Sequence, residues 1–194
     1  MYFGLSEEQT SLEESIKRYL ADNAPLEVIK EMATGNQEKV KTIHKGLIDL
    51  GISALLVPEK YGGLELDILF ASVVSGALGS GTAPVPFVGA YVMAPLAINL
   101  AGNEDQKEYW LPKIAGGEVI VSLGLSEFIG ARENASIDFS KGKVSGRALF
   151  LIDGKNADAF IVSNKSGHLF LINSKDPGIS VIELTTVDKT RTSI

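Results

Sequence analysis

The sequence of 194 residues contains no cysteine and only two histidines. The absence of cysteine excludes disulfide bonds, thiolate catalysis and cysteine-bound metal or iron–sulfur sites. His44 and His168 are isolated from one another along the chain, and a pair so placed does not favour a metal site or a catalytic triad. A chain without cysteine suits a reducing compartment, so we expect a cytoplasmic location.

Positive charge is also scarce in this chain. It has 18 basic against 24 acidic side chains, a net charge of −6, and no run of lysine or arginine alternates with aromatic residues. Binding to a phosphate backbone requires such a basic surface, so nucleic acid is not an expected partner. The acidic residues 1–9 lack the basic flank and the apolar stretch of a secretory signal, and nothing in them directs export.

Charge is missing altogether between Asp67 and Glu104. Prolines and glycines interrupt this segment repeatedly, whereas a membrane-spanning helix needs about 20 continuous apolar residues. We therefore expect buried core helices joined by a loop, and no membrane span.

The first, longer part of the chain has apolar residues at helical spacing. Ser6 has the chemistry of a helix N-cap, and Gly51 lies where a glycine commonly ends a helix. Pro95 predicts a kink in the helix that we expect over residues 88–100. The last helix of this part is expected over residues 104–114, and the whole part is predicted to be helical.

After Gly117 the pattern changes to short β-branched runs separated by turn residues, which is typical of strands. Strands are expected at residues 119–125, 135–139, 144–152, 159–162, 169–172 and 179–182. The predicted fold class is therefore α+β. An all-helical domain would occupy residues 1–117, and a small antiparallel sheet or barrel would occupy residues 118–194.

Two phrases of the sequence carry a resemblance to a known family. The first phrase is Val57–Gly63, Val-Pro-Glu-Lys-Tyr-Gly-Gly, and the second phrase is Gly102–Glu118, which begins Gly-Asn-Glu-Asp-Gln-Lys. Both resemble the helical N-terminal domain of the acyl-CoA dehydrogenases, flavoenzymes that oxidise a fatty-acyl thioester at its α and β carbons. The resemblance runs from Met1 to about Arg191. It implies that the long uncharged helices line the acyl pocket.

In that family, the strand leading out of the helical domain ends where the flavin ring and the CoA thioester meet the protein. The corresponding stretch here begins Leu-Gly-Leu-Ser-Glu. The resemblance implies that Leu123, Leu125 and Ser126 contact the flavin and that Gly130 and Ala131 lie at the substrate. Alanine and arginine stand where the family has Ser-Asp, which removes a serine contact to the pantetheine. The alternative is that Ser-Glu is an ordinary strand end.

A second flavin phrase of the family matches this chain in spacing from Gly146 to Asp158. The resemblance implies cofactor contacts by Phe150, Leu151 and Ile152, and Phe150 can present an aromatic face to the ring. In the family a threonine at the position of Ile152 hydrogen-bonds flavin N5. Isoleucine cannot make this bond, which is worth roughly 1 kcal/mol. The alternative is that Phe150 and Ile152 are alternating core residues of a β-hairpin.

The family reaction needs a base at the α carbon and a hydride acceptor, FAD N5, at the β carbon. The base is a glutamate in a C-terminal helical bundle that would begin beyond Ile194, so we expect no catalytic residue in this chain. The resemblance implies FAD as cofactor, acyl-CoA as substrate and an electron-transfer flavoprotein or a similar protein as electron acceptor.

Three interpretations of the sequence remain open. The chain is part of an FAD-dependent acyl-CoA dehydrogenase of lipid degradation, or a non-catalytic subunit of a heteromeric dehydrogenase, or a binding or structural module on the same scaffold. The full-length protein is expected to be a homo- or hetero-oligomer. The 194 residues alone are expected to be inactive, to hold FAD poorly and to be monomeric or weakly associated.

Overall fold

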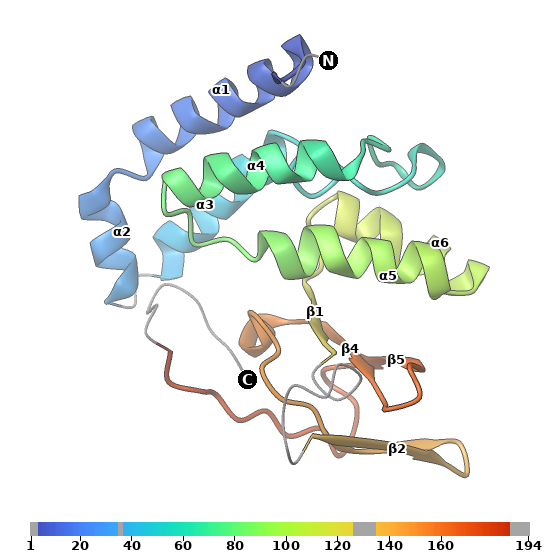
Figure 1. Cartoon of the computed structure of the whole chain (residues 1–194). Helices are drawn as coiled ribbons and strands as arrows, with labels where there is room; N and C mark the ends of the chain where they lie inside the picture. Colours follow the sequence, from blue (N-terminus) through green and yellow to red (C-terminus); the bar gives the residue numbers. More distant parts are fainter. Residues whose placement is uncertain (1–3, 35–36, 126–134, 187–194) are drawn as a thin grey trace.

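The computed structural model describes residues 4–34, 37–125 and 135–186. Helices form one layer of the molecule, and the strands lie on one side of that layer (Figure 1). Most helices are α-helices, whereas η1 and η3 are 3-10 helices and η2 is a π-helix. The elements are α1 (Glu7–Asn23), α2 (Leu26–Ala33), α3 (Gln37–Asp49), η1 (Glu59–Tyr61), α4 (Ile68–Ser80), η2 (Phe87–Met93), α5 (Ala94–Ala101), α6 (Glu104–Ala115), β1 (Val121–Gly124), β2 (Ser136–Ser140), β3 (Lys143–Arg147), η3 (Gly154–Asn156), β4 (Ala159–Ser163) and β5 (Leu169–Asn173).

The predicted helix ends are confirmed where side chains or glycine define them. Ser6 caps α1 in a capping box with Gln9, so two backbone N–H groups at the helix start are satisfied. Gly51 follows α3 with a φ of 87°, a backbone conformation that glycine adopts without strain. A second capping box, between Asn103 and Gln106, starts α6.

The helix expected over residues 88–100 is two helices of different type. The N–H of Ala94 donates to the carbonyl of Gly89, five residues back, which is the hydrogen bond of a π-helix. Pro95 follows in the first turn of α5 and has no N–H to donate. The structure has the π-helix η2 directly before α5, and the kink expected at Pro95 stays a prediction.

The sheet is mixed, so the expectation of purely antiparallel pairing is wrong. The sheet order is β1-β4-β5, in which β1 and β4 are parallel and β4 and β5 are antiparallel. The chain leaves β1 at its C-terminal end, passes through the β2–β3 hairpin and begins β4 beside the start of β1, and such a crossover makes two paired strands parallel. The order of helices followed by a small sheet region is confirmed.

Two expected strands are also corrected by the structure, since one is shorter than expected and the other is not formed. The strand predicted over residues 144–152 ends at Arg147, since Phe150 has a φ of 60°, in the left-handed region. Residues 179–182 form no strand, and Ile182 is 67% exposed. β-Branched composition alone does not make a strand when the segment lacks a partner and a buried face.

One apolar core joins the helices to the sheet. Alternate residues of β1 and β4, such as Leu123 and Ile161, face the helices and belong to the same buried cluster as them. On the opposite face of the sheet, Phe160 and Val162 pack with Ile137 of the hairpin in a second, smaller cluster. The molecule therefore has three layers, helices, sheet and hairpin. The division into two domains at residue 117 stays a prediction.

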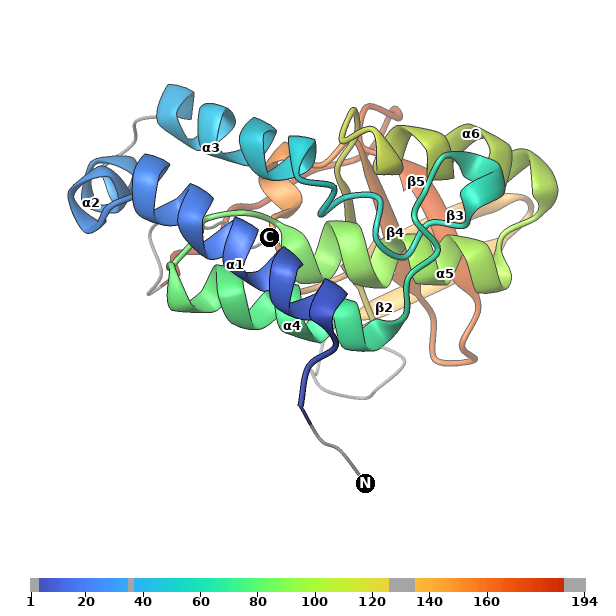
Figure 2. The same cartoon turned by 90° about the horizontal axis from the view of Figure 1, so that it is seen from above.

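Within the described part of the chain, no helix has both the length and the apolar character that crossing a membrane requires. The uncharged segment is instead divided among α4, η2 and α5; α4 packs on α1 and on η2, and η2 packs on α5 (Figure 2).

Candidate functional site

The two phrases that are far apart in sequence meet in the structure. The hydroxyl of Tyr61, in the first phrase, donates to Glu104 Oε2 of the second phrase at 3.0 Å. Lys107 binds Glu104 Oε1 at 3.1 Å, and the Nζ of Lys60 lies 3.5 Å from Oε2. The hydrogen bond from Lys107, followed by that from Tyr61, lowers the pKa of Glu104. The contact fixes η1 against the start of α6, the helix that leads into β1.

A second contact holds the beginning of β1 on the sheet. The N–H of Ile120 donates to Asp158 Oδ2 at 3.0 Å, and the N–H of Asp158 donates to the carbonyl of Ile120 at 2.8 Å. The aspartate that ends the second flavin phrase therefore aligns β1 with β4. This side chain has a positioning role that spacing alone did not reveal.

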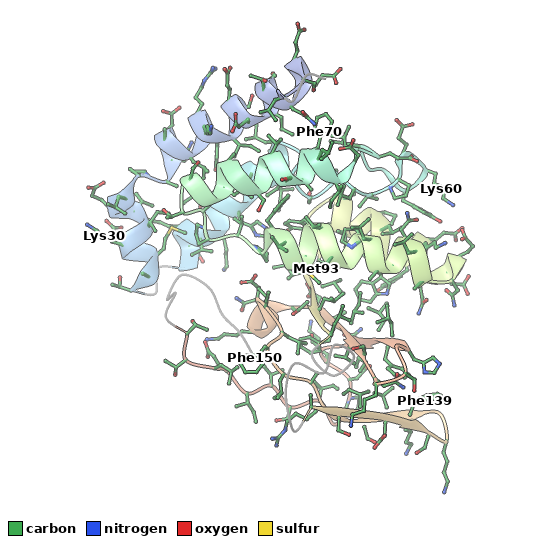
Figure 3. All side chains as sticks on the ribbon, viewed as in Figure 1. Lys30, Lys60, Phe70, Met93, Phe139 and Phe150 are labelled. Carbon is green, nitrogen blue, oxygen red and sulfur yellow. The ribbon has the colours of Figure 1, made fainter. Side chains whose placement is uncertain are left out.

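The segment Phe150–Ile152 lies beside β1 and has an alternating pattern of exposure. Leu151 is buried in the second core cluster, whereas Phe150 is 46% and Ile152 is 41% exposed. Ser122 of β1 donates its hydroxyl hydrogen to the carbonyl of Ile152 at 2.8 Å, which ties the segment to the strand. Phe150 lies in the strand layer below the helices (Figure 3). Phe150 and Ile152 are thus not core residues of a hairpin, contrary to the alternative drawn from the sequence.

The other predicted site residues fall into two groups. Leu123 is buried against the helices, and Leu125 is half-buried on the same cluster. Ser126, Gly130 and Ala131 lie outside the described residues. The hydrogen bond from Ser122 to the carbonyl of Ile152 places β1, the strand of Leu123, next to Ile152. The cofactor and substrate contacts expected for all these residues stay predictions.

The π-helix faces the same segment from the helical layer. A Cβ atom built on Gly89 would lie 3.8 Å from the carbonyl oxygen of Ile152, an ordinary van der Waals distance. π-Helical turns are rare and occur frequently at functional sites. Gly89 and Ser122 are not among the site residues that the sequence predicts, and their only signals in the sequence are a glycine within an apolar helix and a hydroxyl within an apolar strand.

A partly buried histidine and a buried tyrosine link the π-helix to α3. His44 Nε2 and the hydroxyl of Tyr91 lie 2.8 Å apart and share a hydrogen bond, and Tyr91 is fully buried. Burial raises the pKa of Tyr91. Burial also lowers the pKa of His44, and the nearby Asp153 opposes this shift without reversing it. Among the described residues no group of three potential metal ligands occurs, so the pair is best understood as a structural contact.

The lowered pKa of His44 predicts a pH-dependent stability. The unfolded chain binds a proton at His44 below the ordinary pKa of about 6.5, whereas the folded chain does so only at lower pH. Stability is therefore expected to fall as the pH falls below about 6.5 towards the folded-state pKa. Urea unfolding at a series of pH values should show a shallower fall for the double variant His44→Leu/Tyr91→Phe. An unchanged slope in that variant would mean that other groups cause the dependence.

Comparison with known proteins now gives the family. The family described as acyl-CoA dehydrogenase, N-terminal domain, matches residues 6–118, which is more than half of the chain. The chain belongs to the acyl-CoA dehydrogenase family. Among curated proteins it is similar to the mitochondrial isovaleryl-CoA dehydrogenase of Pongo abelii, with 30% identity over 174 residues. That alignment covers 84% of this chain and 40% of the relative, so the chain spans about two fifths of the relative's length.

Solved structures show the same fold. One chain of the ChsE4–ChsE5 complex from Mycobacterium tuberculosis has a TM-score of 0.84 at 24% identity, and the match covers 100% of this chain and 54% of that one. An acyl-CoA dehydrogenase from Bacillus anthracis, solved in complex with FAD, has a TM-score of 0.77 at 23% identity, covering 97% of this chain and 36% of that one. At these identities the likeness concerns the fold.

The residues around position 152 fit a flavin ring in polarity but do not supply every contact. Phe150 and Ile152 present apolar surface that a planar aromatic ring can cover. The carbonyl oxygen of Ile152 already accepts a hydrogen bond from the Ser122 hydroxyl. The side chain of Ile152 has no group that could donate a hydrogen bond to N5 of the flavin. The segment can therefore support the isoalloxazine by packing, without a side-chain hydrogen bond from position 152.

Proposed function

We propose that this chain supplies part of the flavin-binding surface and part of the acyl-binding wall of an FAD-dependent acyl-CoA dehydrogenase. The reaction is the removal of two hydrogens from the α and β carbons of an acyl-CoA thioester. The observation that carries the proposal is the half-exposed apolar pair Phe150 and Ile152, held against β1 by Ser122 and faced by the π-helix. Apolar side chains at a junction of two layers are the usual lining of a cofactor or substrate site.

FAD, when bound, supplies the hydride acceptor. The residues of this chain bind, orient and exclude water: Phe150 and Ile152 pack on the ring, while Ser122 fixes the backbone that carries them. The π-helix closes the other side of the acyl space. We propose no residue of this chain as the catalytic base, because none matches the glutamate that the family resemblance implies for this role.

The names of similar proteins support an acyl-CoA substrate with a branched chain. Two relatives are named isovaleryl-CoA dehydrogenase and 2-methylacyl-CoA dehydrogenase, and both names describe branched acyl groups. We also propose an electron-transfer flavoprotein or a similar protein as electron acceptor, because the family resemblance implies one. We further propose that the intact protein acts in lipid degradation in the cytoplasm.

A second candidate function is a non-catalytic subunit of a heteromeric dehydrogenase. It is favoured by Ile152, which cannot donate a hydrogen bond to N5, and by alanine at position 131 in place of the family's serine. The fold neighbour solved as the ChsE4–ChsE5 complex consists of two different chains. In this case flavin binding would require a related partner that supplies the missing contacts.

Replacement of Phe150 tests the proposed flavin surface. In the intact native protein, isolated with any subunit that co-purifies, Phe150→Ala is expected to weaken FAD binding about tenfold through the loss of aromatic packing. Phe139→Ala is the matched control, since Phe139 is also an exposed aromatic residue but lies in the hairpin (Figure 3). FAD dissociation is measured by flavin fluorescence. Equal effects of the two substitutions, or no effect of either, would remove Phe150 from the flavin surface.

A further inference from the structure

His44 interacts with two other segments of the chain. It belongs to α3, and its Nε2 atom lies 2.8 Å from the hydroxyl of Tyr91, a fully buried residue of the π-helix. Burial lowers the pKa of His44 and the charge of Asp153 raises it, so the carboxylate of Asp153 lies within electrostatic reach of the imidazole. His44 therefore connects α3 with the π-helix and with the turn that follows Ile152.

Asp153 has a side chain that its own turn does not explain. Its φ is 58°, in the left-handed region, which glycine adopts without strain and most other residues avoid. It begins η3, yet its side chain makes no hydrogen bond to the backbone at the start of that helix. Capping therefore does not account for the carboxylate, whereas the interaction with His44 gives it a partner in the helical layer.

The hydrogen bond with Tyr91 decides which nitrogen of His44 carries the proton. Burial raises the pKa of Tyr91, so its hydroxyl stays protonated near neutral pH and can donate to Nε2. A neutral imidazole that accepts a hydrogen bond at Nε2 has its proton on Nδ1. That N–H group is the part of the ring that a nearby carboxylate attracts. The phenol of Tyr91, the imidazole of His44 and the carboxylate of Asp153 thus interact in this order.

Both ends of this series of interactions lie beside Ile152. Asp153 is the next residue along the chain, and Gly89 of the π-helix faces the carbonyl oxygen of Ile152, which lies 3.8 Å from its Cβ position. A displacement of either end would change the separation between the π-helix and the partly exposed side chains of Phe150 and Ile152. These are the side chains that we propose to pack on the flavin ring.

We propose that His44 and Asp153 are positioning residues for flavin binding: the imidazole holds the π-helix through Tyr91 and holds the Phe150–Ile152 segment through Asp153. The proposal rests on the function proposed above and adds the interactions that keep the two sides of that site at a fixed separation. Both residues act through neighbouring elements, and neither is assigned a contact with the flavin or with the acyl group.

Replacement of Asp153 by asparagine tests this role, because asparagine has nearly the same shape, tolerates the left-handed conformation and carries no charge. The matched control is Asp138→Asn, which removes a carboxylate from the exposed face of the hairpin. The pKa and the tautomer of His44 are measured by NMR on the intact native protein, labelled at histidine and isolated with any subunit that co-purifies. FAD dissociation is measured by flavin fluorescence on the same preparations.

Neutral His44 of the wild-type protein is expected to carry its proton on Nδ1. Asp153→Asn should lower the pKa of His44 further, since it removes the charge that raises this pKa. The same variant should weaken FAD binding about fivefold, the usual effect of one lost polar interaction, with a Tm within about 3 °C of the wild-type value. Asp138→Asn should change neither the pKa of His44 nor the affinity for FAD.

A second variant tests whether the two residues act together. His44→Gln should weaken FAD binding to a similar extent as Asp153→Asn. The double variant His44→Gln/Asp153→Asn should bind FAD no more weakly than the weaker of the two single variants, because both substitutions break the same series of interactions.

Each part of the inference can be overturned separately. An unchanged pKa of His44 in Asp153→Asn, or a proton on Nε2 of the neutral ring, would remove the interactions on which it rests. A lowered pKa with unchanged FAD binding, or additive effects of the two substitutions, would remove the positioning role and leave the proposed dehydrogenase function intact. Failure of the wild-type protein to bind FAD would overturn the proposed function and the positioning role with it, whatever the pKa of His44.

Discussion

Replacement of Gly63 by alanine is expected to destabilise the protein by at least about 3 kcal/mol, since the added carbon overlaps backbone atoms that cannot rotate away. The Cβ of an alanine at position 63 would lie 1.9 Å from the carbonyl oxygen of Val57. That oxygen accepts the N–H of Glu65, so relief of the overlap would break the turn that holds η1. The last glycine of the first phrase is thus explained by close approach of two backbone segments.

The neighbouring glycine provides the matched control. Gly62 has a φ of 82° but no described atom within 4 Å of its Cβ position, so Gly62→Ala should cost only the strain of a left-handed alanine, about 1–2 kcal/mol. Urea unfolding monitored by circular dichroism gives both values. A smaller loss of unfolding free energy for Gly63→Ala than for Gly62→Ala would contradict this explanation, because the turn would then accommodate the added carbon without breaking its backbone contacts.

Replacement of His44 by alanine is expected to cost about 2–4 kcal/mol, because it leaves the buried hydroxyl of Tyr91 without its partner and creates a cavity. Tyr91→Phe, which removes the hydroxyl itself, should cost only about 1 kcal/mol. The double variant should be about as stable as His44→Ala or slightly more stable, since no hydroxyl is then left unpaired.

The coupling free energy between His44 and Tyr91 is obtained from the unfolding free energies of the wild-type protein, the two single variants and the double variant. Tyr109→Phe serves as the control, since Tyr109 is exposed and should tolerate the change with little loss. Strictly additive effects of His44→Ala and Tyr91→Phe would contradict a stabilising hydrogen bond between α3 and the π-helix.

Local chemistry accounts for the parts of the fold that the sequence predicts. Ser6 and Gly51 act within a few residues of their own positions, and a side-chain cap or a left-handed glycine marks a helix end whatever the remainder of the chain does. The boundaries of the helices and of most strands follow from such signals together with the period of the apolar residues.

The features that the sequence does not predict depend on partners that are distant along the chain. The parallel pairing of β1 with β4 is set by the path of the intervening hairpin, which no local pattern encodes. The left-handed conformation of Phe150 ends a run that reads as a strand, since a non-glycine residue gives no sign of positive φ. The role of Asp158 as a support of β1 appears only when the two strands are seen together.

The candidate site was predictable to a similar extent. The spacing of the second flavin phrase indicates Phe150 and Ile152, which are both partly exposed and have the buried Leu151 between them in the sequence. Their contact with a flavin stays a prediction. Gly89 and Ser122 could not be found in this way, because their importance lies in facing Ile152 from other elements.

The most direct test of the account is the absorbance of the intact native protein during anaerobic addition of isovaleryl-CoA. The account predicts a yellow protein, isolated alone or with a related subunit, whose oxidised-flavin absorbance is lost as the acyl-CoA is added. A protein that remains colourless in the presence of excess FAD, or a bound flavin whose absorbance does not change with any acyl-CoA, would contradict it.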